Sequence, residues 1–454
     1  MFKPIRSRNP LLRLNPPQVL AVGFLIMILA GAGLLCLPAA SSSGRAMPFM
    51  DALFMAASAT CVTGLSVLNP GVDLTTYGQL VLIALVQIGG LGFMTVATLI
   101  ALVFRRRISF RERLILQETM SQHSTEGIIR LVRKVVLYAI VIESVGALLL
   151  FVRFSFEMPL GQAAYFGAFH SLSIFNNAGF DLFGAIQGRA SSLIHYVDDP
   201  FVNLIAMPMI LLGGIGFIVI ADLLDYPRKR KLSLHSKVVL FMTAVLVVVG
   251  AVVIFVFEYT NPATLRPLDL SGKTFASLFQ SITSRSAGMS TLDVGAMRQA
   301  TQFFMVIMMF IGAAPGSAGG GIKVTTFAIL IGAMISMIRG RQDIVFFRYR
   351  IAQDRVYKAI TFSLLSFLLI VVSAMILSAT ENYSFLGILF ETTSAYATAG
   401  ISMGLTTHLT PFGQFMITLL MFIGRLGPVT LAFTLTPRMD NEPFRYPEGK
   451  VTIG

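Results

Sequence analysis

The sequence has 454 residues, of which 55% are hydrophobic and only 13% are charged. A soluble protein carries about 25% charged residues, so the composition excludes a soluble domain and indicates a polytopic membrane protein. The formal net charge of +13 does not indicate nucleic-acid binding, because most Lys and Arg residues are grouped between apolar runs. The groups fall at residues 1–13, 105–134, 228–237, 339–358 and 438–450.

These basic groups alternate with connections of low charge, as the positive-inside rule predicts for cytoplasmic segments. Both termini are therefore expected in the cytoplasm, which requires an even number of spans. The first apolar run, residues 19–38, is longer than the ~7–15 residues of a signal-peptide core. This length favours a retained first helix over the alternative, a cleaved signal peptide. Cys36 and Cys61 lie in apolar segments and are interpreted as packing residues.

Eight apolar segments are long enough to cross a bilayer. They lie near residues 18–38, 77–104, 135–153, 201–223, 238–257, 301–337, 357–379 and 412–434. Between the members of each pair lies a shorter apolar segment, at 47–60, 160–175, 272–284 and 384–397. Segments of ~10–14 residues are too short to span and are typical of re-entrant helices. The sequence therefore predicts an all-α polytopic membrane protein with eight transmembrane helices and four re-entrant pore helices.

Each short segment ends in a stretch of small residues around a glycine. The four glycines, Gly64, Gly179, Gly288 and Gly400, are spaced 115, 109 and 112 residues apart. One such glycine alone is more often a loop or a helix cap, but four at near-equal spacing indicate an internal repeat. Each repeat reads span, re-entrant helix, glycine turn, span. The repeats are assigned to residues 1–104, 105–225, 226–338 and 339–454, the last including the C-terminal tail.

Four glycine turns at membrane depth predict a pore, because irregular backbone is tolerated there only if it is buried in protein or lines water. Turns that meet on a pseudo-fourfold axis would form a ring of carbonyl oxygens that replaces the hydration shell of potassium. Each re-entrant helix would also point the negative end of its dipole toward the ion. The residues expected to bind the ion are Val62, Thr63, Gly64, Asn177, Ala178, Gly179, Ser286, Ala287, Gly288, Thr398, Ala399 and Gly400.

The sixth expected span is the only one that is heavily interrupted. Residues 312–323 contain five glycines and one proline, which disfavour a helix by ~1 kcal/mol per glycine and ~3 kcal/mol for proline. The clustering favours a mobile loop, and close helix packing through small residues is the alternative. The residues assigned to this gate loop are Gly312, Pro315, Gly316, Ser317, Gly319, Gly320, Gly321 and Lys323.

These segments resemble the four pore loops of the Trk/Ktr/HKT superfamily of potassium transporters, in which one chain carries four membrane–pore–membrane units. The most specific matches are Phe-Asn-Asn-Ala-Gly-Phe-Asp-Leu (175–182), Ser-Ile-Thr-Ser-Arg-Ser-Ala-Gly-Met (281–289) and Glu-Thr-Thr-Ser-Ala-Tyr-Ala-Thr-Ala-Gly (391–400). The resemblance covers nearly the whole chain. Its eight spans are more similar to Ktr pore subunits than to Trk pores, which have extra N-terminal spans.

The resemblance implies potassium uptake across the bacterial plasma membrane, with potassium held at the filter and the interrupted sixth span acting as a gate. Gly64 favours potassium, because serine at that position accompanies sodium transport in related plant transporters. Uptake driven by the membrane potential, and often stimulated by sodium, is also implied. The implied partners are membrane lipid, a second copy in a homodimer, and a cytoplasmic ATP- or ADP-binding ring of the KtrA or KtrC type. No cofactor bound by this chain is expected.

Three basic residues, Arg285, Lys323 and Arg425, fall inside the expected membrane segments, where charge is rare and marks functional candidates. The resemblance places Arg425 in the last span facing the pore, where it would repel cations. An ion pair between Arg425 and a neighbouring acid is the alternative. Arg285 is expected to brace the third turn by pairing with an acid such as Glu391.

Two other classes of function fit the sequence less well. An alternating-access secondary transporter for another small cation or solute is the main alternative, and it predicts two matching broken spans related by inversion. Only one span here is heavily interrupted. An enzyme would need clustered carboxylates or histidines at membrane depth, whereas the five histidines are scattered and His170 is expected to pack.

Overall fold

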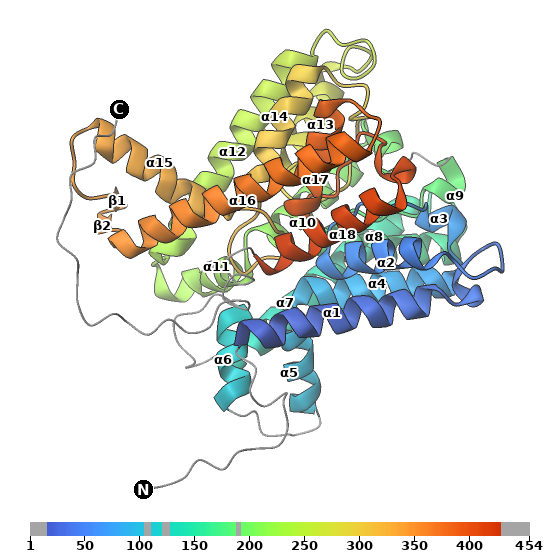
Figure 1. Ribbon diagram of the computed structural model, residues 1–454, viewed down its shortest axis with the longest axis horizontal. Coiled ribbons are helices and arrows are strands. Elements are labelled where there is room, and N and C mark those ends of the chain that lie inside the picture. Colours follow the sequence, from blue (N-terminus) through green and yellow to red (C-terminus); the bar gives the residue numbers. More distant parts are fainter. Residues whose placement is uncertain (1–15, 104–109, 120–127, 188–191, 428–454) are drawn as a thin grey trace, which may run out of the picture.

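A computed structural model of the chain describes residues 16–103, 110–119, 128–187 and 192–427. Its helices repeat in one order: a long helix, a short re-entrant helix, a turn, and a second helix (Figure 1). The long helices are α1 (Pro16–Leu35), α7 (Ile128–Phe154), α12 (Leu234–Glu258) and α16 (Gln353–Thr380). The re-entrant helices are α2 (Phe49–Cys61), α8 (Leu160–Phe175), α13 (Leu270–Thr283) and α17 (Phe385–Tyr396).

The second helices are shorter than the spans expected from the sequence. They are α4 (Thr76–Leu91), α10 (Pro200–Gly214), α14 (Gln299–Phe310) and α18 (Pro411–Leu426), and the first three continue as α5 (Phe93–Val103), α11 (Phe217–Lys229) and α15 (Val324–Ile338). By length and composition, the four long helices can each cross a membrane, and a fifth span results if α10 and α11 count as one. These two helices are bent by 104° relative to each other.

The sixth span, which alone was predicted to be heavily interrupted, is therefore not the only second helix at which the chain turns. Glycines with positive φ follow the other second helices, at Gly92 (81°), Gly216 (87°) and Gly427 (84°). Glycine adopts this conformation at little cost, whereas other residues are strained in it. One glycine with positive φ is enough to turn the chain, so these breaks need no long interruption such as residues 312–323.

Polar residues fix where the second helices begin. Asp199 and Thr410 cap α10 and α18 by accepting hydrogen bonds from backbone N–H groups of the first turn, and a proline follows each cap. Thr75 caps α4 in the same way. Capping satisfies helix N–H groups that have no intrahelical partner, and proline fits the first helical position because its missing N–H is not needed there.

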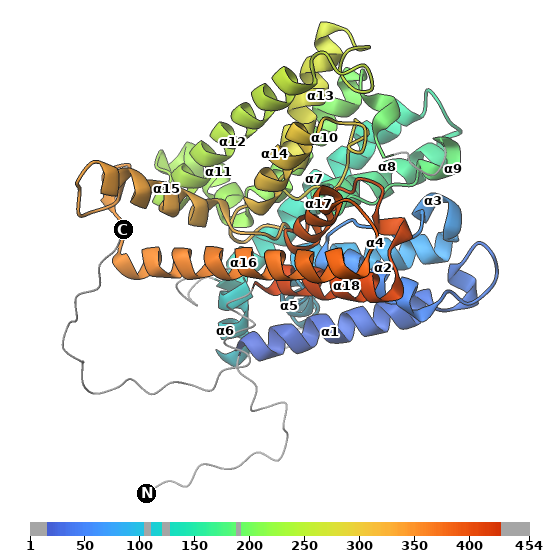
Figure 2. The same cartoon turned by 45° about the horizontal axis from the view of Figure 1, so that its top comes forward.

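The repeats form a closed ring. The second helix of each repeat packs against the re-entrant helix of the next: α4 on α8, α10 on α13, α14 on α17, and α18 on α2. Figure 2 shows the repeats in chain order around the molecule, from blue through teal and yellow-green to orange. Large apolar side chains such as Leu148 and Val256, which are 60% and 63% exposed, remain on the outer surface, as expected for a lipid-facing belt.

The remaining elements lie at the two ends of the helices. The short helices α3 (Pro70–Asp73) and α9 (Gly184–Gln187) lie at one end, near the ends of the re-entrant loops (Figures 1 and 2). At the other end lie α6 (Phe110–Thr119) and the hairpin of β1 (Val345–Phe346) and β2 (Tyr349–Arg350). Three 3-10 turns, Pro38–Ala40, Ile194–Tyr196 and Thr406–His408, complete the described elements.

Candidate pore and gate

The four predicted turns share one backbone pattern. In each turn the glycine has a positive φ, between 73° and 96°, and so does the residue two positions earlier, between 47° and 75°. The earlier residues are Val62, Asn177, Ser286 and Thr398. A β-branched residue in this region is a genuine outlier, so surrounding structure must hold Val62 and Thr398 in place. Such strain is concentrated at functional sites.

The four glycines bring the turns into contact in ring order. A Cβ atom on Gly64 would collide with the carbonyl of Ala178, and one on Gly179 would lie 2.7 Å from the Cα of Gly288. A Cβ on Gly288 would lie 3.4 Å from the carbonyl oxygen of Ala399. A Cβ on Gly400 would collide with the carbonyl of Thr63, which closes the ring. At Gly64, Gly179 and Gly400 the neighbouring turn is too close for any side chain, whereas the contact from Gly288 to Ala399 is of ordinary van der Waals length.

Three re-entrant helices end in the same hydrogen bond, and the third helix differs. The residue before each glycine donates its N–H to a carbonyl five residues earlier, at Ser58, Ser173 and Ser394, over 2.8 Å in every case. In the third repeat Ala287 donates to Thr283, four residues earlier, over 3.1 Å. The third turn is therefore closed by a different hydrogen bond, which reaches back four residues instead of five.

Glycines on three of the second helices let the helix approach the end of a re-entrant helix. A Cβ at any of them would collide with the carbonyl four residues before the turn glycine. The pairs are Gly89 with Thr60, Gly213 with Phe175, and Gly424 with Tyr396. Sequence reasoning missed these positions, although a signal exists: Ile-Gly-Gly-Leu-Gly (88–92), Leu-Gly-Gly-Ile-Gly (212–216) and Ile-Gly-Arg-Leu-Gly (423–427) are variants of one motif.

In the third repeat a loop, residues 311–323, replaces the single glycine break. Its ends are joined by a parallel bridge between Ile311 and Ile322, and the Gly312 N–H donates to the carbonyl of Ile322 over 2.9 Å. A segment of this length whose ends meet is a compact Ω-type loop. All eight predicted gate residues, Gly312 to Lys323, belong to it or end it.

The gate loop lies against the third and fourth turns. The Gly320 N–H donates to the Thr398 hydroxyl over 2.8 Å, and a Cβ on Gly319 would lie 2.8 Å from the Cβ of Ser286. Its opposite side is held by the second repeat, because the Ala314 N–H donates to the carbonyl of Gly214 over 3.0 Å. The predicted loop and the predicted turns are thus one contiguous structure.

Arg425 ties this loop to the first repeat. One guanidinium nitrogen donates to the carbonyl of Ala318 in the loop and another donates to the carbonyl of Gly89 at the first break. In the repeated motif, Arg425 occupies the position of Gly90 and Gly214. Among the described residues, no carboxylate forms an ion pair with Arg425, which removes the alternative of a neighbouring acid.

The prediction that Arg285 pairs with Glu391 is wrong. Glu391 accepts hydrogen bonds from the hydroxyl groups of Ser402 and Thr406 instead. Arg285 is 7% exposed, its Nε has no hydrogen-bond partner, and it lines a small cavity with Thr243 and Ala313.

The expectation that His170 packs is confirmed, whereas the gate role of Lys323 stays a prediction. Lys323 lies at the end of the gate loop, and its Nζ donates to the carbonyl of Gly319 over 2.5 Å. His170 packs within a cluster of aromatic rings and stacks on Phe183 with ring centroids 4.3 Å apart. Cys36 and Cys61 are both free thiols, and Cys61 is fully buried.

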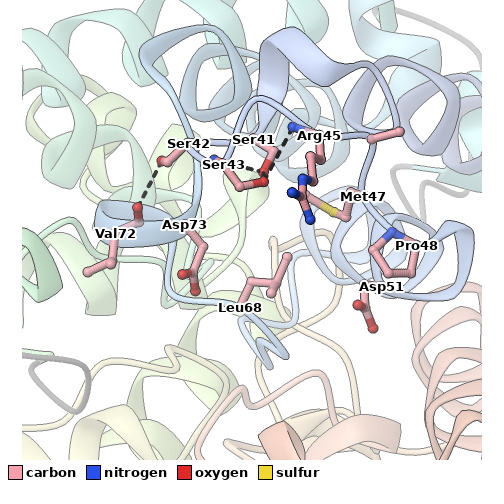
Figure 3. Close-up of a pocket in the computed structure, with 11 residues that line it drawn as sticks. Ser41, Ser42, Ser43, Arg45, Met47, Pro48, Asp51, Leu68, Val72 and Asp73 are labelled. Carbon is pink, nitrogen blue, oxygen red and sulfur yellow. Dashed lines mark hydrogen bonds between the residues drawn. The ribbon is translucent and has the colours of Figure 1, made fainter.

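A pocket of about 240 Å³ lies at the outer end of the first repeat (Figure 3). Arg45, Asp51 and Asp73 line it together with three serines, Ser41 to Ser43. Its polar groups serve the local loops: the Ser42 hydroxyl donates to the carbonyl of Val72 over 2.8 Å, and Asp73 accepts from the Asn69 N–H over 2.8 Å. None of the predicted ion-binding residues lines this pocket.

The chain is similar to cation transporters over nearly its whole length. The family model described as "TrkH: Cation transport protein" matches residues 15–442. The Ktr system potassium uptake protein B of Bacillus subtilis (strain 168) is 41% identical over 442 residues, 97% of each chain. The potassium/sodium uptake protein NtpJ of Enterococcus hirae is 38% identical over 448 residues, 97% of this chain and 98% of that one.

The same fold is found in a solved structure. The potassium transporter TrkH from Vibrio parahaemolyticus matches with a TM-score of 0.71, covering 96% of this chain and 86% of that chain. The two sequences are 19% identical, so this likeness speaks for the fold alone.

Proposed function

We propose that this chain, which belongs to the TrkH family of cation transport proteins, takes up potassium across the bacterial plasma membrane through the ring of four glycine turns. The observation that carries the proposal is the closed ring, in which Gly64, Gly179, Gly288 and Gly400 each approach a neighbouring turn. The filter is formed by the twelve residues of these turns, from Val62–Gly64 to Thr398–Gly400.

Backbone geometry and electrostatics support a cation in this ring. A left-handed residue on either side of a residue with negative φ turns successive carbonyl groups toward one side of the chain, which suits a ring of carbonyl ligands. The four re-entrant helices end directly before the turns, so the negative ends of their dipoles point at the ring. Gly64, Gly179 and Gly288 are only partly buried, as groups lining a water-filled path would be.

Residues 311–323 act as the gate of this pore in our proposal. The loop contacts Ser286 and Thr398 of the filter directly, and Arg425 holds it by the carbonyl of Ala318. A cation leaving the filter meets both the loop and the guanidinium charge. Opening then requires the loop to leave Gly214, Thr398 and Arg425, and a hydrogen bond between neutral groups such as the first two is worth only about 1 kcal/mol.

The main alternative is an alternating-access transporter, whose broken helices are related by inversion. The breaks at Gly92, Gly216 and Gly427 follow the same motif in the same direction along the chain, which favours a fourfold pore. Sodium stimulation is part of the proposal, and its site is not assigned to residues of this chain. A pore that conducts gives uptake that follows the membrane potential without a coupled ion.

Regulation comes from partners in this proposal: a second copy in a homodimer and a cytoplasmic nucleotide-binding ring. The β1–β2 hairpin presents an exposed tip at the end of the molecule that carries α6, with Phe347 and Arg348 in the left-handed conformation. Val345 and Tyr349 are 53% and 57% exposed. We expect the chain to copurify with such a ring and its flux to respond to ATP or ADP only when the ring is present. Nucleotide-sensitive flux of the isolated chain would contradict this part.

Potassium and rubidium flux into liposomes, with sodium as competitor, tests the filter. Gly64→Ser and Gly288→Ser place a side chain where the ring closes, so we expect weaker uptake or weaker rejection of sodium at normal protein levels. Gly404→Ser is the matched control, because Gly404 also has a positive φ (88°) but nothing within 4 Å of its Cβ position. If both filter variants keep the affinity and selectivity of the unmodified chain, the assignment is wrong.

A further inference from the structure

Each turn is held from behind by side chains of its own re-entrant helix. Among them are the hydroxyl groups of Ser173 and Thr283, which donate to the carbonyls of Phe180 and Met289. After the glycine, the chain leads away from the ring, and we call this segment of each repeat the limb. In every repeat a hydrogen bond joins this limb to a fully buried side chain of the re-entrant helix. The four side chains are Met55, His170, Gln280 and Glu391, which are at most 1% exposed. We call them the braces.

In the first and third repeats the limb donates from a serine hydroxyl to an uncharged acceptor. The Ser66 hydroxyl lies 3.3 Å from the sulfur of Met55 and also lies against the carbonyl of Leu68. The Ser290 hydroxyl lies 3.0 Å from Oε1 of Gln280 and also lies against the carbonyl of Leu292. In both repeats the brace therefore shares the single hydroxyl proton with a backbone carbonyl. Both serines lie two residues after the turn glycine, so the two contacts are equivalent in position but differ in the strength of the acceptor, since a thioether sulfur is a weak one.

In the second and fourth repeats the acceptor is an imidazole and a carboxylate. The Leu182 N–H donates to Nε2 of His170 over 3.2 Å, while Nδ1 pairs with the carbonyl of Phe166 over 2.8 Å. A carbonyl only accepts, so these partners assign the proton of the neutral ring to Nδ1. Glu391 accepts from the Ser402 hydroxyl, and its second oxygen accepts from Thr406 over 2.9 Å.

The positions of the braces follow the turns rather than the glycine count. Every brace lies three residues before the carbonyl that caps its turn, at Ser58, Ser173, Thr283 or Ser394. Counted from the glycine, Gln280 is eight residues back and the other three are nine, because the third turn is capped four residues back instead of five. The brace therefore keeps its position relative to the bond that caps its turn.

We propose that these four braces are positioning residues that set how strongly the ring rejects sodium. This inference rests on the proposed filter. Sodium is smaller than potassium, so carbonyls that coordinate it must move inward, and a limb that is fixed from behind resists this movement. The ring is unevenly braced: the thioether of Met55 holds the first turn least and the carboxylate of Glu391 holds the fourth turn most.

The test exchanges the braces of the first and third turns. Gln280→Met removes the oxygen acceptor at similar side-chain length, and we expect the ratio of apparent affinities for potassium over sodium to fall about fivefold, the factor for one hydrogen bond of ~1 kcal/mol. Met55→Gln supplies an oxygen to Ser66 and should raise the same ratio by about twofold. Maximal uptake and membrane protein level are measured alongside, since a merely structural role would change these instead.

Two controls keep the test decisive. Ser277→Ala removes a buried hydroxyl of the same helix whose bond, to the carbonyl of Lys273, stays within the helix, and it should leave the ratio unchanged. Ser290→Ala removes the other partner of Gln280. Its effect should match that of Gln280→Met, and the double variant should be no worse than either single one. If Gln280→Met does not fold, Ser290→Ala alone decides.

The outcomes separate this proposal from the filter on which it depends. If Gly288→Ser lowers the ratio but Gln280→Met and Ser290→Ala do not, the braces are ordinary packing and the filter stands. Additive effects of Gln280→Met and Ser290→Ala would also overturn the brace, because the two groups would then act independently. If Gly288→Ser also leaves the ratio of apparent affinities unchanged, the filter assignment itself fails.

Discussion

The third repeat departs from the other three at two places that lie against each other. Its turn is capped four residues back instead of five, and its second helix is interrupted by residues 311–323 instead of by a single glycine. In the first, second and fourth repeats, Gly89, Gly213 and Gly424 press the second helix onto the end of a re-entrant helix. The third repeat has the gate loop in that place.

This difference indicates that the four repeats, although built on one plan, are not held together in the same way. Three repeats keep the ring closed through contacts too short for any side chain, so they have little freedom to move. The third repeat, together with Arg425, carries a loop held by a few hydrogen bonds. One repeated plan thus gives three repeats with a close glycine contact and a third repeat with a loop in its place.

The largest effect is expected where the rigid repeats are closest. Gly213→Ala and Gly424→Ala each drive a Cβ into a backbone carbonyl that cannot move aside, which should cost about 1–3 kcal/mol or more and reduce the yield of folded protein. Gly33→Ala is the control, because nothing lies within 4 Å of that Cβ position. Thermal unfolding in detergent compares the stability of the three variants. Equal stability would show that the backbone around Gly213 and Gly424 can shift to accept a methyl group.

The next effect concerns the gate loop itself. Shortening residues Ala313–Gly320 removes the contacts with Ser286 and Thr398 and leaves the rigid repeats intact. We expect faster resting uptake with less dependence on the regulatory partner. Rubidium uptake at matched protein level measures this. A structural role for the loop would instead give poor folding or lower flux.

Replacing Arg425 separates its charge from its contacts. Arg425→Ala removes both the positive charge beside the path and the bonds to Ala318 and Gly89, so maximal uptake should rise, about tenfold for each ~1.4 kcal/mol of barrier removed. Apparent potassium affinity should change little, because the filter is untouched.

Arg425→Lys keeps the charge but lacks the planar fork that reaches two carbonyls. If charge forms the barrier, uptake by the lysine variant stays low. If the hydrogen bonds to the loop form the barrier, uptake by the lysine variant rises toward that of the alanine variant. Slower uptake by Arg425→Ala at normal protein level would contradict both accounts.

The smallest effect is expected at the link between the loop and the fourth turn. Thr398→Ala removes the hydroxyl that accepts from the Gly320 N–H, a bond worth about 1 kcal/mol, and should raise resting uptake a few-fold. Thr398→Ser keeps the hydroxyl and is the matched control. Equal resting uptake of the two variants would mean that this bond does not hold the loop.

The sequence determined the plan, because hydrophobicity and spacing report local choices. Apolar length separated long helices from re-entrant ones, and the predicted 160–175 is the observed α8. The positions of Gly64, Gly179, Gly288 and Gly400 followed from a repeat spacing, and the five glycines of 312–323 marked a segment that does not form a helix. These signals require no knowledge of which residues meet.

Only the tertiary structure determined which residues are in contact. The breaks at Gly92 and Gly216 depend on a single φ angle, and the sequence did not indicate that Arg285 lies beside Thr243 and Ala313 instead of Glu391. The ties of Arg425 to Ala318 and Gly89 join residues 107 and 336 positions apart. Every residue has a backbone carbonyl, so no sequence pattern can predict which carbonyls accept hydrogen bonds from the guanidinium of Arg425. The packing of the helices determines this.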